Sequence, residues 1–106
     1  MRALLAAGAN INTAATDGAT PLYMPAQQGH TDTVRALLAA GANVEAARNN
    51  GMRSLHAASI NDHAAVATLL LDAGADVNAL TNAGISPLAC ALTPAMRSLL
   101  AARVGV

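Results

Sequence analysis

The middle of the chain holds the residue types from which proteins build hydrolytic sites. One stretch of ten residues contains Ser54, His56, Ser59, Asp62 and His63. A serine beside a histidine that an acidic group orients is the arrangement of a nucleophilic triad. Ser59 and His63 could meet only on one uninterrupted helix, because residues four apart share a helix face. The repeat pattern described below breaks the helix at positions 61–62, so we expect structural roles for these side chains and no enzymatic activity.

The histidines and the single cysteine lack the spacing of a metal site. His30, His56 and His63 are separated by 26 and 7 residues, and Cys90 follows 27 residues later. A zinc site needs three or four converging ligands, and this spacing matches none of the common zinc motifs. Cys90 occupies a position typical of a small helical residue, which favours a buried, unreactive thiol over a nucleophile. We therefore expect no metal and no other cofactor.

Composition and charge point away from nucleic acids and membranes. The chain has 106 residues, with six arginines, no lysine, six acidic residues and a net charge of zero. The arginines are scattered and the glycines do not gather before a helix, so neither a nucleic-acid surface nor a phosphate loop is indicated. Apolar stretches are far shorter than the ~20 residues that cross a bilayer. We expect one soluble domain that is not exported, and a single cysteine suits a cytoplasmic location.

An internal repeat of 33 residues organises the chain. Three sets of residues recur at this period: Gly8, Gly41 and Gly74; Gly18, Gly51 and Gly84; Leu22, Leu55 and Leu88. A Leu-Leu pair followed by a Gly-Ala pair recurs with them, in segments 4–9, 37–42 and 70–75. Self-similarity at this period is typical of proteins built from stacked structural units.

Each full repeat is predicted to begin with a short helix. Thr20 is a good N-cap, and Pro21 suits the first helical position because its missing N–H would be unpaired there in any case. We expect this helix to run from Thr20 to Gln28. Pro25 then falls in its interior, where a proline removes a backbone donor and costs about 3 kcal/mol unless the helix bends or the lost hydrogen bond is dispensable.

A second helix and a loop complete the repeat. Val34, Leu37 and Leu38 have the spacing of an apolar stripe on a helix. Gly41 follows the stripe and is expected to end the helix as a left-handed C-terminal cap. Turn residues over 43–51 then favour a hairpin-like loop.

The next copy repeats this pattern, and the last copy departs from it. A first helix is expected over 54–61, with Ser54 near the cap position, and Gly74 ends the second helix that Val66, Leu69 and Leu70 stripe. In the last copy the Leu-Leu pair of the second helix, at 99–100, comes four residues before the 33-residue period predicts. We therefore expect a shortened connection between the two helices of this copy. We expect residues 93–94 to restart the second helix there.

The repeated unit resembles the ankyrin repeat over nearly the whole chain. In the best copy the matching residues are Gly18, Thr20, Pro21, Leu22, Ala26, Gly29, His30, Val34, Leu37, Leu38, Gly41 and Ala42. In the following copy they are Gly51, Leu55, His56, Ala57, Ala58, His63, Leu70, Leu71, Gly74, Ala75, Val77 and Asn78. The resemblance implies an all-α solenoid of stacked antiparallel helix pairs with short hairpin-like loops. It divides a single domain, 1–106, into a half repeat at 1–15, repeats at 16–48 and 49–81, and a shortened repeat at 82–106.

The resemblance also implies a function. Ankyrin-repeat proteins generally bind other proteins through their loop tips and the concave face of the first helices. Carried over position by position, the partner-binding residues would be Thr16, Asp17, Ala19, Gln27, Gln28, Asn49, Asn50, Met52, Ile60, Asn61, Asn82, Ala83 and Ile85. Tyr23 takes the place of the family's histidine, which favours a structural role. The alternatives are a structural fragment of a longer ankyrin protein and, less favoured, a small hydrolase.

The N-terminal half repeat supplies only a second helix. Its residues 1–7 carry Arg2 as their only charge and lack a neighbour on one side, so we expect an exposed apolar strip there. Such a strip at the end of a stack frays or recruits another chain. Self-association through this helix is therefore expected, with a disordered N-terminus as the alternative.

Overall fold

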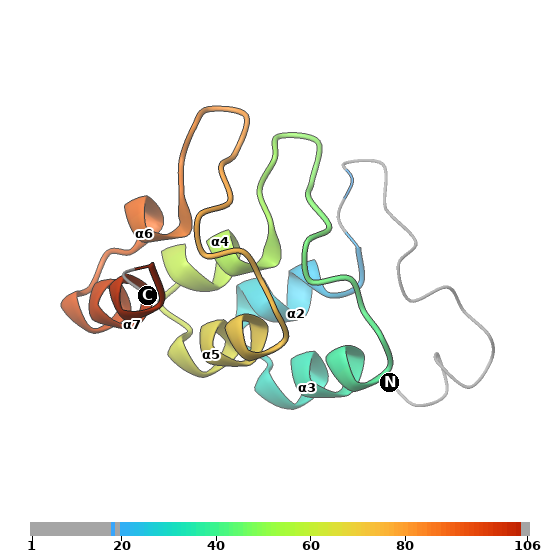
Figure 1. Ribbon diagram of the computed structural model, residues 1–106. Coiled ribbons are helices and arrows are strands. Elements are labelled where there is room, and N and C mark those ends of the chain that lie inside the picture. Colours follow the sequence, from blue (N-terminus) through green and yellow to red (C-terminus); the bar gives the residue numbers. More distant parts are fainter. Residues whose placement is uncertain (1–17, 19, 105–106) are drawn as a thin grey trace.

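The protein is a stack of helix pairs from which hairpin loops project to one side (Figure 1). The computed structural model describes residue 18 and residues 20–104. The helices in that part of the chain are α2 (Tyr23–Gln28), α3 (Thr31–Ala39), α4 (Ser54–Ile60), α5 (Ala64–Asp72), α6 (Pro87–Cys90) and α7 (Pro94–Val104). These residues form no strand beyond an isolated antiparallel bridge between Ala47 and Arg53. The predicted all-α fold is confirmed.

The helices form two rows. The first helices of the repeats, α2, α4 and α6, lie in one row beside the hairpins, and α3, α5 and α7 lie in the other (Figure 1). α2 packs against α3 and α4, and α4 packs against α5 and α6. Each of these first helices therefore contacts the second helix of its own repeat and the first helix of the next repeat, as in a solenoid. None of the helices described is long and apolar enough to cross a membrane.

Glycines end the second helices as the sequence predicted. Gly41 and Gly74 have φ angles of +94° and +98°, in the left-handed region. The N–H of Gly41 donates to Leu38 O at 3.1 Å, and the N–H of Ala42 donates to Leu37 O at 3.0 Å. This is the Schellman pattern, which satisfies the last carbonyls of the helix and turns the chain toward the hairpin.

The start of α2 differs from the prediction, whereas α4 begins at Ser54 as predicted. α2 begins at Tyr23 instead of Thr20, and the N–H of Tyr23 donates to Thr20 O at 3.0 Å in the turn before it. Pro25 therefore lies in the first helical turn, where backbone N–H groups have no partner within the helix, so the expected cost of an interior proline does not arise. In α4 the N-cap is Arg53, and Ser54 is the first helical residue.

The last repeat is shortened in its first helix. The predicted shortening of the connection between its helices is wrong, because residues 91–93 join α6 to α7 and the equally long segment 61–63 joins α4 to α5. α6 has only four residues, and its N-cap Ser86 accepts the N–H of Ala89 at 3.2 Å. α7 begins at Pro94, and the hydroxyl oxygen of Thr93 accepts the N–H of Met96 at 3.2 Å. α4 has seven residues, so α6 is about one helical turn shorter than the first helix of the preceding repeat.

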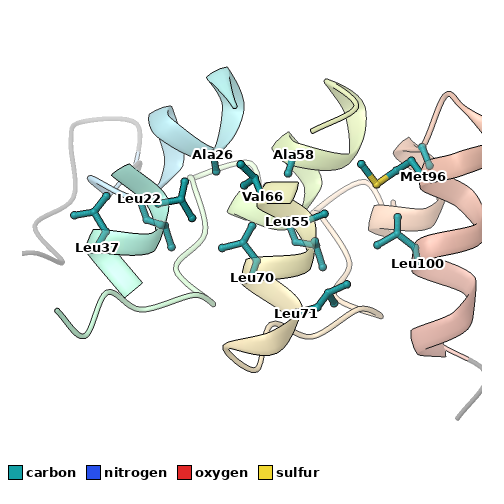
Figure 2. Close-up of a cluster of buried hydrophobic side chains, with 13 residues drawn as sticks. Leu22, Ala26, Leu37, Leu55, Ala58, Val66, Leu70, Leu71, Met96 and Leu100 are labelled. Atoms are coloured by element: carbon teal, nitrogen blue, oxygen red, sulfur yellow. The ribbon is translucent and has the colours of Figure 1, made fainter. Parts of the chain in front are cut away.

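The core is an aliphatic layer between the two rows of helices. Figure 2 shows side chains from both rows pointing into it, among them Leu22, Ala26, Leu37, Leu55, Ala58, Val66, Leu70, Leu71, Met96 and Leu100. No aromatic side chain belongs to this cluster of described residues. Small aliphatic side chains allow close approach of the helices, so the layer packs without large rings.

Several predictions lie outside the described residues. These are the half repeat at 1–15, with its expected apolar strip, and the candidate binding residues Thr16, Asp17 and Ala19.

Candidate functional site

The two described hairpin tips have the same internal geometry, 33 residues apart. In the first, the N–H of Arg48 donates to Met52 O and the N–H of Gly51 donates to Arg48 O, both at 2.8 Å. In the second, the N–H of Thr81 donates to Ile85 O at 3.0 Å, and the N–H of Gly84 donates to Thr81 O at 2.8 Å. A glycine at positive φ closes each turn because an L side chain is disfavoured there.

Successive tips are bound to one another. The backbone N–H of Asn82 donates to Asn50 O at 3.0 Å, and its side-chain amide donates to Asn49 O at 2.9 Å. A Cβ atom at Gly51 would lie only 2.6 Å from the backbone nitrogen of Asn82, and one at Gly18 would lie 2.8 Å from Asn49 Oδ1. The tips therefore form one continuous surface, and glycine permits their close approach.

A buried histidine holds the base of the second hairpin. His56 Nε2 lies 3.0 Å from Ala79 O and 2.9 Å from Ile85 O, and its Nδ1 accepts the N–H of Arg53 at 3.2 Å. The neutral tautomer with its proton on Nε2 satisfies all these contacts. Burial lowers the pKa of His56, and the two carbonyls oppose this effect only in part. The ring therefore positions the hairpin that carries Asn82 and Ile85.

The preceding repeat has a tyrosine in the same place. Tyr23 is buried, and the guanidinium carbon of Arg48 lies 5.1 Å from the centre of its ring. A cation at this distance is attracted to the ring face. Tyr23 thus supports the first hairpin from below and is not an outward-facing anchor for a partner.

Comparison with known proteins agrees with this repeated geometry. A family model described as ankyrin repeats, in three copies, matches residues 1–81. The chain belongs to the ankyrin-repeat family. Ankyrin repeats are in general modules of protein–protein interaction, and the family is typically non-enzymatic. A comparison with curated proteins finds no match.

The candidate binding residues of the ankyrin repeats that the structure describes lie in two places. At the hairpin tips, Asn49, Asn50, Asn82, Ala83 and Ile85 are exposed and Met52 is half-buried. At the C-terminal ends of the first helices, Gln27, Gln28, Ile60 and Asn61 are exposed. Amides in this set are already engaged within the protein: Asn82 bonds to the neighbouring tip, Asn61 Nδ2 donates to Ala57 O at 2.8 Å, and Asn50 Oδ1 accepts the N–H of Met52 at 3.0 Å. The described candidate residues include both polar and apolar side chains, and none of them is charged.

Three residues of the serine and histidine cluster, Ser59, Asp62 and His63, have structural contacts. Ser59 is buried, and its hydroxyl donates to Pro87 O at 2.6 Å. The chain breaks between α4 and α5 as predicted, and Asp62, at φ +61°, accepts the hydroxyl of Thr93 at 2.8 Å. The ring of His63 covers Gly29 of the preceding repeat, where a Cβ would lie 2.6 Å from it.

The thiol and the metal-ligating side chains are the other reactive groups of the described residues. Cys90 is buried, and desolvation raises the pKa of its thiol. A raised thiol pKa lowers the thiolate fraction and thus the nucleophilicity. Across the part of the chain that the structure describes, no three His, Cys, Asp or Glu side chains gather in a way that could hold a metal ion.

The sequence analysis did not predict three exposed apolar residues. They are Met24 on α2, Leu80 in the second hairpin and Leu92 after α6. A comparison of Met24 with Ala57 and Cys90, its equivalents one and two periods later, would have shown an unusually large side chain at this position. The exposure itself depends on neighbouring repeats, which a single period of sequence does not contain.

Proposed function

We propose that the chain is an interaction module that binds a partner protein through its hairpin tips and the exposed ends of the first helices. The binding residues are those of the ankyrin pattern: Thr16, Asp17, Ala19, Gln27, Gln28, Asn49, Asn50, Met52, Ile60, Asn61, Asn82, Ala83 and Ile85. The main support is the pair of hydrogen bonds from Asn82 to the preceding tip. They join separate loops into one surface that exists before a partner binds.

Preorganisation of this kind favours binding. Ordering flexible loops on association costs free energy that a fixed surface avoids. Within the described part of this surface, Ile60 and Ile85 offer exposed apolar area, and the exposed asparagines and glutamines of the set offer amides. Because Asp17 is the only charged residue in the proposed set, we expect the affinity for the partner to depend only weakly on salt concentration.

The binding surface can be tested with charge insertions at the second tip. Ala83→Arg and Ile85→Arg place a large charged side chain on the proposed surface, and Ala39→Arg places the same group at an exposed site on α3, in the other row of helices. Tagged proteins are used for quantitative pull-down from the native cell type. We expect the tip variants to recover the partner at least about tenfold less than the wild type, as for changes at interface hot spots.

The control variant decides the interpretation. Ala39→Arg should recover the partner as the wild type does, and all three variants should keep their melting temperatures within a few degrees, because exposed substitutions change stability by about 0.5 kcal/mol or less. Equal recovery by the tip variants and the control would contradict the assigned surface.

Two related proposals accompany this one. We infer no catalytic role, because the hydroxyl of Ser59, the only serine placed near His63 by the sequence pattern, is buried and committed to Pro87 O. A cytoplasmic location is proposed from the composition and the single cysteine. A structural segment of a larger ankyrin assembly is the second candidate function, and the exposure of Met24, whose equivalents Ala57 and Cys90 are buried, favours it.

A further inference from the structure

Asn50 is followed by a glycine, and asparagine is chemically least stable in this pair. Asparagine is a thermally labile residue, because the backbone nitrogen of the next residue can attack its side-chain amide carbon. Glycine has no Cβ and leaves that nitrogen open to react. Among the asparagines of the sequence, only Asn50 precedes a glycine, Gly51. The pair lies in the first tip, residues 48–52, where Asn50 is exposed to solvent.

The reaction of this pair needs only water and hydroxide. The Gly51 nitrogen gives its proton to hydroxide and attacks Asn50 Cγ. The bond from Cγ to the side-chain nitrogen breaks, and ammonia leaves with a proton taken from water. Water then breaks one of the two C–N bonds of the resulting cyclic imide. Opening at Cγ gives aspartate, and opening at the main-chain carbonyl gives isoaspartate, in which the chain runs through Cγ.

The peptide group that has to react is held at both of its polar atoms. Asn50 O accepts the N–H of Asn82 at 3.0 Å, and the N–H of Gly51 donates to Arg48 O at 2.8 Å. Ring closure removes the proton from the Gly51 nitrogen, so the bond to Arg48 O has to break first. Asn82 also closes over Gly51, where a Cβ would lie only 2.6 Å from the Asn82 backbone nitrogen. The folded tips therefore slow the attack.

The side chain of Asn50 is held as well. Its Oδ1 accepts the N–H of Met52 at 3.0 Å. The second tip, residues 81–85, adds a further link, because the amide of Asn82 donates to Asn49 O at 2.9 Å. The imide joins the Gly51 nitrogen to Cγ, so its closure needs freedom of both the side chain and the peptide group. We therefore expect the reaction to pass through an open state in which the second tip has moved away.

We propose that Asn50 is a deamidation site that the second tip protects, and that its isoaspartyl product separates the two tips. In isoaspartate the chain between Arg48 and Gly51 is longer by one methylene group, and the former Asn50 carbonyl is a free carboxylate outside the chain. The turn that holds Asn50 O opposite the N–H of Asn82 is thereby lost. Because ammonia has left, the protein does not reverse the change, and the fraction of joined tips falls as the protein ages.

The test compares the folded protein with variants whose tips are released. Asn82→Ala removes the side-chain bond to Asn49 O and keeps the backbone bond. Asn82→Pro removes both bonds, and proline is favoured at the second position of a four-residue turn such as the one that the N–H of Gly84 closes. The matched control is Asn61→Ala, which also removes one amide bond, to Ala57 O, but at the end of α4.

The rate is measured on the full chain in mildly alkaline buffer. Trypsin cuts after Arg48 and Arg53 and so releases the peptide 49–53, whose unchanged, aspartyl and isoaspartyl forms are separated by chromatography and identified by fragmentation mass spectrometry. The wild type unfolded in urea gives the unprotected rate. A synthetic peptide of residues 47–54, with and without urea, corrects for the effect of urea on the chemistry. Far-UV circular dichroism verifies the fold of each variant.

The folded wild type should deamidate at Asn50 roughly tenfold more slowly than the unfolded chain, because two hydrogen bonds of ordinary strength have to open. Asn82→Pro should raise the folded rate about threefold or more, Asn82→Ala should raise it less, and Asn61→Ala should leave it unchanged. The proposal is overturned if folded and unfolded chains react equally fast, if no folded Asn82 variant reacts faster than the wild type, or if Asn61→Ala accelerates the reaction as much.

The structural effect of the product has a readout of its own. Aged wild-type protein is separated into its aspartyl and isoaspartyl fractions, and each is unfolded in urea. Asn50→Asp is the reference, because it keeps the main chain and its carboxylate can still accept the N–H of Met52. The isoaspartyl fraction should unfold at a lower urea concentration than Asn50→Asp. Equal midpoints would refute the separation of the tips.

Discussion

Replacing Gly51 by alanine should destabilise the protein more than replacing Gly84 by alanine, although the two glycines occupy the same place in successive hairpins. Their φ angles are +86° and +78°, so both positions disfavour an L side chain to a similar degree. Their surroundings differ, because a Cβ at Gly51 would lie 2.6 Å from the backbone nitrogen of Asn82 and one at Gly84 would meet nothing within 4 Å. Comparing the two variants therefore separates the cost of backbone strain, which both share, from the cost of disturbing the packing of one tip on the next, which only Gly51→Ala has.

The expected magnitudes follow from these two contributions. A left-handed backbone costs an L residue roughly 1–2 kcal/mol, which is the whole expected effect of Gly84→Ala. At Gly51 the clash also forces the tips apart and weakens two hydrogen bonds from Asn82, to Asn50 O and Asn49 O. Each such bond contributes about 0.5–1.5 kcal/mol, with the lower part of the range suited to an exposed site. We therefore expect Gly51→Ala to cost about 2–4 kcal/mol in total.

Urea unfolding followed by circular dichroism measures both variants. The free energies of unfolding should differ by about 1–2 kcal/mol, and the melting temperature of Gly51→Ala should be lower than that of Gly84→Ala by several degrees. Gly18→Ala serves as a second packed position, since a Cβ there would lie 2.8 Å from Asn49 Oδ1. Equal losses for Gly51→Ala and Gly84→Ala would refute the view that tip-to-tip packing stabilises the surface.

Two further predictions concern the core and the buried histidine. Leu70→Ala should lower the free energy of unfolding by about 2–5 kcal/mol, because Leu70 is fully buried and its truncation leaves a cavity, whereas Leu80→Ala, at an exposed site, should stay within about 0.5 kcal/mol in the same urea titration. Because burial lowers the pKa of His56 in the folded state, the unfolded chain binds the extra proton first, so stability should be complete above about pH 6.5 and fall as the pH drops below it. The melting temperature of His56→Gln should change less with pH across this range than that of the wild type. An equal dependence on pH in the two proteins would contradict the role of His56.

Local features of the sequence were sufficient to predict where the second helices end and where the last one begins. Gly41 and Gly74 follow apolar stripes, and each takes the left-handed conformation that stops a helix. Thr93 and Pro94 begin α7 as predicted. These outcomes depend on the φ preferences of single residues and on hydrogen bonds within one turn, so the local sequence contains the necessary information.

Outcomes that depend on a neighbouring repeat needed the tertiary structure. Pro25 looked like an interior proline, but α2 starts at Tyr23 in the structure, so Pro25 lies in its first turn. Asn82 was predicted as a contact for a partner, and in the folded protein its amide also binds the preceding tip. Met24 and Ala57 hold the same place in the repeat, yet one is exposed and the other buried. The 33-residue period determined the fold of each unit, and the position of the unit in the stack decided which faces are covered, because burial is a property of the neighbours and not of the residue.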